Sequence, residues 1–217
     1  MIMRWGMIIN LAKCVGCNSC VVKCAQEHFL PSGVLWGKLL IGESGSFPTA
    51  IKHVYPVLCN HCKEPKCAEV CPTGATQKRE DGVIYIDADQ CVGCRACVMA
   101  CPYQVRTFYA ERKEHYPGQG FTEFEEMGQK LYPLELGTVV KCNFCMEKID
   151  SGLKRGLKPG VDRDATPACV ITCPAHARYF GDLDDENSEI SALMRKWRPA
   201  QLHAEFGTDP SVYYVTG

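Results

Sequence analysis

Short runs of β-branched and aromatic residues dominate the hydrophobic pattern of the chain. Such runs cover residues 5–9, 83–86, 105–109 and 177–180, and each of them predicts a short strand. The dipeptide Asp81-Gly82 directly precedes the second run, and Asp-Gly between β-prone segments is typical of a hairpin turn. The pattern therefore predicts short strands joined by turns.

One amphipathic repeat lies near the C-terminus. Apolar residues at helical spacing predict a helix over residues 188–197: Ile190, Leu193, Met194 and Trp197. We expect this apolar stripe to pack on the chain's own core, as most such stripes do, and docking on a partner subunit is the alternative. No stretch of eighteen consecutive apolar residues occurs, so no membrane-spanning helix is predicted.

The composition is ordinary for a globular protein except for its cysteines. The 217 residues allow one or two domains, and the net charge of −1 gives no strong electrostatic case for nucleic acid or anionic lipid. The N-terminus predicts neither a cleavable signal peptide nor a twin-arginine signal. The chain has 16 cysteines, which approaches the range where disulfides or metal sites organise the fold.

Every cysteine falls into one of four groups. Disulfide partners are usually scattered along a sequence, so this grouping favours metal sites over disulfides. A zinc site takes two C-x2-C pairs separated by a longer loop, and only the fourth group resembles that pattern. The groups are Cys14, Cys17, Cys20 and Cys24 (group one); Cys59, Cys62, Cys67 and Cys71 (group two); Cys91, Cys94, Cys97 and Cys101 (group three); and Cys142, Cys145, Cys169 and Cys173 (group four).

The spacing within the groups points to cubane [4Fe–4S] clusters. Groups one and three read C-x2-C-x2-C-x3-C, the run in which bacterial ferredoxins bind one cluster with three thiolates and the neighbouring cluster with the fourth. Groups two and four keep the closing C-x3-C and stretch an earlier gap. Proline follows the last cysteine of groups two, three and four, where it turns the chain away from the cluster.

Because the fourth cysteine serves the neighbouring cluster, the clusters come in pairs. Groups two and three are adjacent and form one pair, which leaves groups one and four for the other. We therefore expect four [4Fe–4S] clusters. Their expected ligands are Cys14, Cys17, Cys20 and Cys173 for cluster one; Cys59, Cys62, Cys67 and Cys101 for cluster two; Cys91, Cys94, Cys97 and Cys71 for cluster three; and Cys142, Cys145, Cys169 and Cys24 for cluster four.

The same pairing predicts an α+β fold of two bacterial-ferredoxin-like two-cluster units, the second inserted in the first, with loop-rich inserts. The outer unit covers residues 1–58 and 139–183 and holds clusters one and four. The inserted unit covers residues 59–109 and holds clusters two and three. Residues 110–138 form an insert, and residues 184–217 form a C-terminal tail.

Cationic residues beside the cysteines are candidates for tuning the clusters. A lysine precedes a cluster cysteine at four places and an arginine follows one: Lys13, Lys23, Lys66, Lys141 and Arg95. Nearby cations stabilise the reduced form of a cluster and raise its potential. A position on a surface loop explains these residues equally well, since exposed charges are strongly screened.

Other polar residues near the cysteines carry weaker signals. His61 as a ligand would leave one cysteine over, so a hydrogen bond beside the cluster is its preferred role. Tyr103, Gln104 and Arg106 follow group three, where a redox partner could approach, although closing the domain explains each of them better. The chain has no dinucleotide fingerprint, P-loop or Ser-His-Asp arrangement, and no catalytic residue is predicted.

The order of the groups and the residues around them resemble the iron–sulfur subunits of the dimethyl sulfoxide reductase family over nearly the whole chain. The motifs that carry the resemblance are Cys59-Asn60-His61-Cys62, Cys71-Pro72-Thr73-Gly74-Ala75, Cys101-Pro102-Tyr103, Lys141-Cys142-Asn143-Phe144-Cys145 and Gly181-Asp182-Leu183-Asp184-Asp185. These motifs identify the class of subunit and leave the substrate of the complex open.

The resemblance implies an electron-transfer subunit that works between a large catalytic subunit, with a molybdenum or tungsten bis-pterin cofactor, and a further redox partner. That partner is a quinone-reactive membrane anchor subunit or a soluble carrier. It also implies that cluster one lies beside the catalytic subunit and cluster three at the far end. Unassembled thiols are at risk in an oxidising compartment, so we expect assembly in the cytoplasm. The final site is the cytoplasm or, as the resemblance suggests, the periplasm after export with the catalytic subunit. The alternatives are a free polyferredoxin and a self-contained iron–sulfur enzyme, for which no fingerprint exists.

Overall fold

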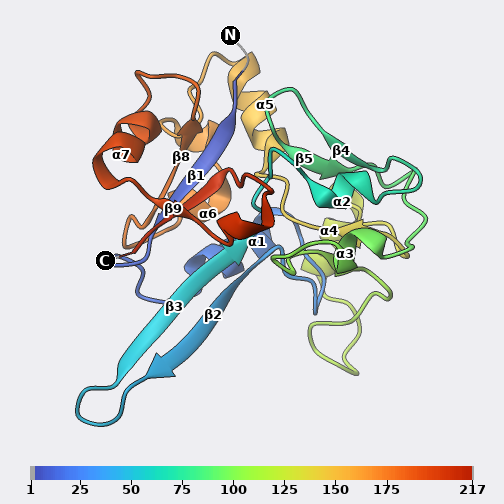
Figure 1. Cartoon of the computed structure of the whole chain (residues 1–217). Coiled ribbons are helices and arrows are strands. Elements are labelled where there is room, and N and C mark those ends of the chain that lie inside the picture. Colours follow the sequence, from blue (N-terminus) through green and yellow to red (C-terminus); the bar gives the residue numbers. More distant parts are fainter. Residues whose placement is uncertain (1–2, 217) are drawn as a thin grey trace.

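The computed structural model describes residues 3–216, so residues 1, 2 and 217 of the predicted first and last segments lie outside it. The described chain has a mixed α+β fold in which short helices accompany small sheets (Figure 1). The largest sheet has four strands. In order across that sheet they are β8 (Arg178–Asp182), β1 (Trp5–Asn10), β10 (Val212–Val215) and β9 (Ala200–Gln201).

The central strand of this sheet is β1, whose six residues are all buried. It pairs antiparallel with β8 and parallel with β10. The strands predicted over residues 5–9 and 177–180 are therefore confirmed, and the two runs lie side by side. The segment predicted as a C-terminal tail supplies two strands of the same sheet.

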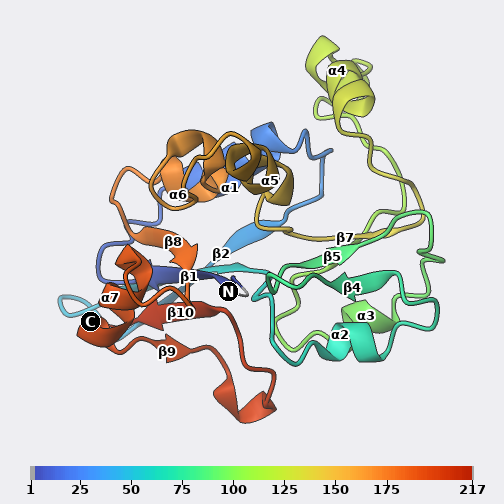
Figure 2. The ribbon, with the colours of Figure 1, turned by 90° about the horizontal axis from the view of Figure 1, so that it is seen from above.

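The predicted C-terminal helix is also present, as α7 (Glu189–Trp197). The Ser188 side chain caps it by accepting a hydrogen bond from the Ser191 amide at 3.2 Å. Its apolar stripe packs against β8 and β1, with Ile190 fully buried, so the preferred interpretation of that stripe is confirmed. Three further helices lie together on one side of the sheet (Figure 2): α1 (Ser19–Glu27), α5 (Met146–Lys154) and α6 (Ala168–Ile171).

Two small two-stranded sheets lie beside this sheet (Figure 2). Strands β4 (Thr76–Lys78) and β5 (Ile84–Ile86) pair antiparallel around the predicted Asp81-Gly82 turn. Strand β6 (Thr107–Phe108) pairs with β7 (Val139–Val140). Strand β6 is shorter than the predicted run 105–109, and its two residues pair with the two residues of β7. Single-turn helices stand in the middle of groups two and three: α2 (Lys66–Glu69) and α3 (Ala96–Met99).

Two elements project from the body of the protein. The hairpin of β2 (Gly37–Ser44) and β3 (Ile51–Leu58) pairs over eight residues and extends away from the sheet (Figure 1). Helix α4 (Glu123–Leu131) projects on the other side (Figure 2), with the Phe124 ring 4.9 Å from that of Phe29. No helix among residues 3–216 has the length and apolar character needed to cross a membrane.

Candidate iron–sulfur sites

The first C-x-x-C loop of each cysteine group shares one backbone feature. The residue before the second cysteine of that loop has a positive φ in all four groups: 69° at Gly16, 42° at His61, 65° at Gly93 and 57° at Phe144. This left-handed conformation curls the loop, so that both thiols face the same side. Glycine adopts it without strain, whereas histidine and phenylalanine need compensation. His61 and Phe144 compensate each other, because their rings stack with centroids 3.7 Å apart in the core.

We call the four cysteines expected to bind one cluster a set, numbered as the clusters are. The cysteines of set one lie around one pocket: Cys14, Cys17 and Cys20, which follow β1, and Cys173, which follows α6. Residues far apart in the sequence thus face one small space. Its apolar lining includes Ile9, Leu39, Pro56 and Pro174.

The cysteines of set three also line a single pocket. Cys91, Cys94 and Cys97 come from the loop before and the first turn of α3, and Cys71 comes from the end of group two. The pocket wall also includes the apolar residues Ala75, Ile86 and Val139.

Set two is more deeply buried. Burial raises the pKa of the Cys62 thiol to about 12. The charges that add to this increase in pKa belong to its three set partners, Cys59, Cys67 and Cys101. A thiol in this position ionises only beside positive charge, and bound iron supplies such charge.

Set four shows the same pattern. Burial raises the pKa of Cys24, and the charges that add to the increase belong to Cys142, Cys169 and Cys145. Cys24 lies in α1, whereas its partners lie around α5 and α6. The structure thus brings together all four thiols of each of the four sets.

Hydrogen-bond donors point at these sulfurs, as they do at the thiolates of iron–sulfur clusters. The amide of Thr76 donates to Cys71 Sγ at 3.4 Å, and the amide of Ala177 donates to Cys173 Sγ at 3.3 Å. Thr76 follows the closing cysteine of group two by five residues, and Ala177 follows that of group four by four. His28 Nε2 lies 3.3 Å from Cys145 Sγ. All sixteen cysteines are free of disulfides, so their thiols are available as ligands of [4Fe–4S] clusters.

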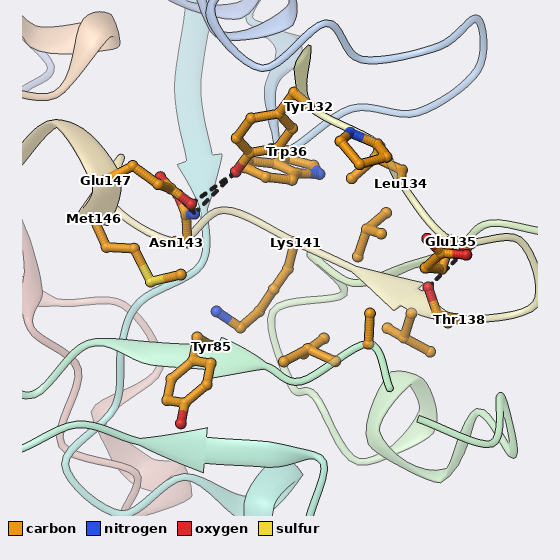
Figure 3. Close-up of a pocket in the computed structure, with 15 residues that line it drawn as sticks. Trp36, Tyr85, Tyr132, Leu134, Glu135, Thr138, Lys141, Asn143, Met146 and Glu147 are labelled. Carbon is orange, nitrogen blue, oxygen red and sulfur yellow. Dashed lines mark hydrogen bonds between the residues drawn. The ribbon is translucent and has the colours of Figure 1, made fainter. Parts of the chain in front are cut away.

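The cationic side chains beside the cysteines differ in their surroundings. Lys23 and Lys66 are paired with Glu27 and Glu69 near the surface, which fits their interpretation as solvated residues. Lys141 is instead buried, with 4% of its surface exposed. Figure 3 shows its side chain reaching from the chain after β7 toward Tyr85 of β5.

His61 accepts a hydrogen bond from the Ile84 amide through Nδ1 at 3.0 Å. Burial lowers the pKa of His61 well below its usual range, and the charges of Lys141 and Arg106 lower it further. The ring is therefore neutral and fixes the loop between Cys59 and Cys62 against β5. The side chains of Tyr103 and Arg106 are buried, so they close the domain and do not form a docking surface.

Three residues lie close to the sulfurs in positions that the sequence did not predict: His28, Arg106 and Arg178. The two arginines each follow the last cysteine of a group by five residues, Cys101 and Cys173 respectively. Alignment of group three on group four would have revealed this repeat. His28 has no comparable signal in the sequence.

Comparisons with known proteins agree with these sites. A family described as a 4Fe–4S dicluster domain matches residues 51–132. The chain is 39% identical to a dimethyl sulfoxide reductase iron–sulfur subunit of Halobacterium salinarum, over 99% of this chain and 79% of the relative. It is 37% identical to a selenate reductase subunit of Mesobacillus selenatarsenatis, over 98% and 72%. The arsenate respiratory reductase iron–sulfur subunit of Shewanella sp. is 36% identical, over 98% and 96%.

The chain belongs to the iron–sulfur subunits of the dimethyl sulfoxide reductase family. The resemblance carried by the cysteine motifs is thereby confirmed. This iron–sulfur subunit is an electron-transfer protein that uses [4Fe–4S] clusters. The similarity to the Halobacterium salinarum relative extends over all four cysteine groups, whereas the dicluster domain family matches groups two and three only.

Proposed function

We propose that this iron–sulfur subunit holds four [4Fe–4S] clusters and relays electrons between a molybdopterin catalytic subunit and a further redox partner. The observation that carries the proposal is the gathering of sixteen thiols into four sets. Each set takes three cysteines from one group and one from another, which is the exchange expected for paired cubanes. When bound, each cluster supplies a one-electron centre.

The proposed ligands are the four sets, and the proposed architecture is one two-cluster unit inserted in another. The pairing of β1 with β8 supports this architecture, because these strands flank groups one and four. The hairpin of β4 and β5 lies between groups two and three and closes the inserted unit. We keep residues 59–109 as the inserted unit, residues 1–58 and 139–183 as the outer unit, and 110–138 as an insert.

The proposed order of the clusters is one, four, two, three. At two steps of this order, the charge of a thiol in one set shifts the pKa of a thiol in the neighbouring set. The charge of Cys20 from set one raises the pKa of Cys169 from set four, with burial as the larger cause. Burial and then the charges of Cys169 and Cys59, the latter from set two, raise the pKa of Cys142 of set four to about 12. Tunnelling falls steeply with distance, so such neighbours are the natural path.

The exposure of the thiols supports a path with two ends. Cys17 of set one and Cys94 of set three are the two thiols of the sixteen that are exposed. Sets two and four have no exposed thiol. Electrons would therefore enter and leave through clusters one and three. We assign cluster one to the catalytic subunit and cluster three to the distal partner, a quinone-reactive membrane subunit or a soluble carrier.

Relatives named as subunits of selenate reductase and of sulfite dehydrogenase support work in a complex over a freely diffusing polyferredoxin. Assembly of the clusters is proposed in the cytoplasm, because thiols that still lack iron are at risk in an oxidising compartment. Final use there or in the periplasm, after export with the catalytic subunit, would follow from the signal that the catalytic subunit carries.

The experiment uses Cys94→Ser in the complex with its catalytic subunit. The substitution should disrupt cluster three and block electron exchange with the distal partner. Substrate turnover with an artificial donor that feeds the catalytic subunit directly should continue. Loss of that turnover, in a complex that still assembles with its molybdenum cofactor, would overturn the proposed order. Cys17→Ser is the matched variant, because it should interrupt the path at the other end.

A further inference from the structure

The charged residues that are buried as a whole among residues 3–216 are all positive. Arg106, Lys141 and Arg178 have 6%, 4% and 8% of their surfaces exposed. One acidic side chain there is comparably buried, that of Glu125 at 6%, and it is already bonded to His115 and Thr122. A buried cation is costly unless a counter-charge lies close to it. The counter-charges of these three residues must therefore come from the cysteine sets.

Arg178 lies between set one and set four. Its Nη2 donates to Cys20 Sγ at 3.5 Å, and its Nη1 donates to Cys169 Sγ at 3.7 Å. Nη1 also lies 3.5 Å from the thioether sulfur of Met7. One guanidinium thus contacts thiols of two neighbouring sets.

Arg106 occupies the corresponding position between set two and set three. Its Nη2 donates to Cys67 Sγ at 2.8 Å, and its Nη1 donates to Thr76 Oγ1 at 3.2 Å. Thr76 in turn donates its amide to Cys71 Sγ of set three at 3.4 Å. Burial opposes the charged form of Arg106 as the largest cause, whereas the charges of Cys67, Cys59 and Cys97 raise its pKa. Arg106 and Arg178 each lie five residues after a closing cysteine, so this placement repeats with the fold.

Lys141 lies between the two units. Its Nζ donates to the carbonyl of Cys142 at 2.8 Å and to the carbonyl of Ile84 in β5. Burial lowers the pKa of Lys141 and the charge of Arg106 adds to this, whereas the charges of nearby thiols oppose it: Cys59 and Cys67 of set two and Cys142 of set four. Lys141 thus lies between set four and set two, and Figure 3 shows its side chain directed toward Tyr85 of β5.

The three cations and the four sets alternate along the proposed path. The order is set one, Arg178, set four, Lys141, set two, Arg106, set three. Four thiolates around an oxidised cube leave a negative site, and each electron adds one more negative charge. A cation between two such sites stabilises whichever of the two holds the electron, so transfer between them changes its electrostatic energy little.

We infer that Arg178, Lys141 and Arg106 are positioning residues that set the potentials of the clusters in pairs, one cation for each junction. This inference rests on the proposed four-cluster function. Each cation should raise the potentials of the two clusters that flank it and leave the other two unchanged. Exposed cations beside cysteines, such as Lys66 with its partner Glu69, should contribute little because water screens them.

The test is a redox titration of the anaerobically purified protein, monitored by electron paramagnetic resonance, with iron counted in every sample. Arg178→Gln should lower two of the four midpoint potentials, and Arg106→Gln should lower the other two. Lys141→Met should lower one member of each pair. We expect each reduction equilibrium constant to fall about tenfold, which corresponds to about 59 mV for a one-electron couple. This pattern needs no prior assignment of signals to clusters.

Matched variants separate charge from packing. Arg178→Lys and Arg106→Lys keep the charge and should restore the wild-type potentials, and Lys66→Gln should leave all four unchanged. If a glutamine variant loses iron, a lysine variant with full iron and unshifted potentials still supports the inference. Unmoved potentials in a glutamine variant with full iron, an equal shift of all four potentials, or loss of iron from both variants of one arginine would overturn it. Wild-type protein without four clusters would instead refute the proposed function.

Discussion

Two glycines in identical C-V-G-C loops should respond differently to the same substitution. Gly16 and Gly93 have φ values of 69° and 65°, so alanine is strained in either loop. An L-residue in the left-handed region costs about 1–2 kcal/mol relative to glycine. The surroundings of the added methyl group decide the rest. At Gly16 it would meet the Val54 side chain, with Cγ2 at 3.2 Å, and that side chain can move aside.

At Gly93 the added methyl group would overlap the carbonyl oxygen of Gly137 and lie 3.0 Å from a ring carbon of Phe108. The overlapping atom belongs to the backbone before β7, so the loop between Cys91 and Cys94 and the paired strands β6 and β7 would have to separate. Such overpacking costs about 1–3 kcal/mol more. Gly93→Ala should therefore destabilise the protein by about 2–5 kcal/mol, against about 1–2 kcal/mol for Gly16→Ala.

The assay is anaerobic release of iron in increasing urea. With about 2 kcal/mol of unfolding free energy lost per molar urea, the additional strain should lower the midpoint of Gly93→Ala by roughly 0.5–1.5 M relative to Gly16→Ala. Equal midpoints in the two variants, or a lower midpoint for Gly16→Ala, would refute the argument that the Gly137 carbonyl restricts this loop.

Three further outcomes follow from the contacts. Cys24→Ser should remove cluster four and spare cluster one, with iron falling to about twelve per chain; spectroscopic loss of cluster one alone would contradict the crossed sets. Phe144→Ala removes the ring stacked on His61 and should cost about 3–5 kcal/mol, measured by the same iron-release midpoint. Arg79 holds the pKa of Asp150 below its usual range, so their pairing stabilises the fold above about pH 4 and is lost as pH falls through the lowered pKa. Asp150→Asn should abolish this acid dependence, which amounts to less than about 1 kcal/mol because the pair is partly exposed.

The local features of the fold were predictable from the sequence. Strands β1 and β8 and helix α7 follow from apolar patterns of the right period, and the hairpin of β4 and β5 follows from Asp81-Gly82. The cysteine groups follow from spacing, because the first three ligands of a cubane lie in one tight loop. In each case the physical cause acts within about ten residues.

The features that were not predicted depend on distant partners. Strand β10 pairs parallel with β1 across 200 residues of sequence, and no local pattern specifies its register. The projecting hairpin of β2 and β3 lies in a segment that carries glycine, proline and aromatic residues without a clear period. Arg106 and Arg178 are buried where thiols from distant parts of the chain accept their hydrogen bonds, whereas an isolated arginine in a sequence is expected at the surface.

Iron and acid-labile sulfide, counted on anaerobically purified protein with zinc measured in the same sample, test the four-cluster account most directly. Four sets of four thiols predict about sixteen irons and about sixteen sulfides per chain if every cluster is a cubane. A count near twelve irons, or abundant zinc in place of iron, would contradict it.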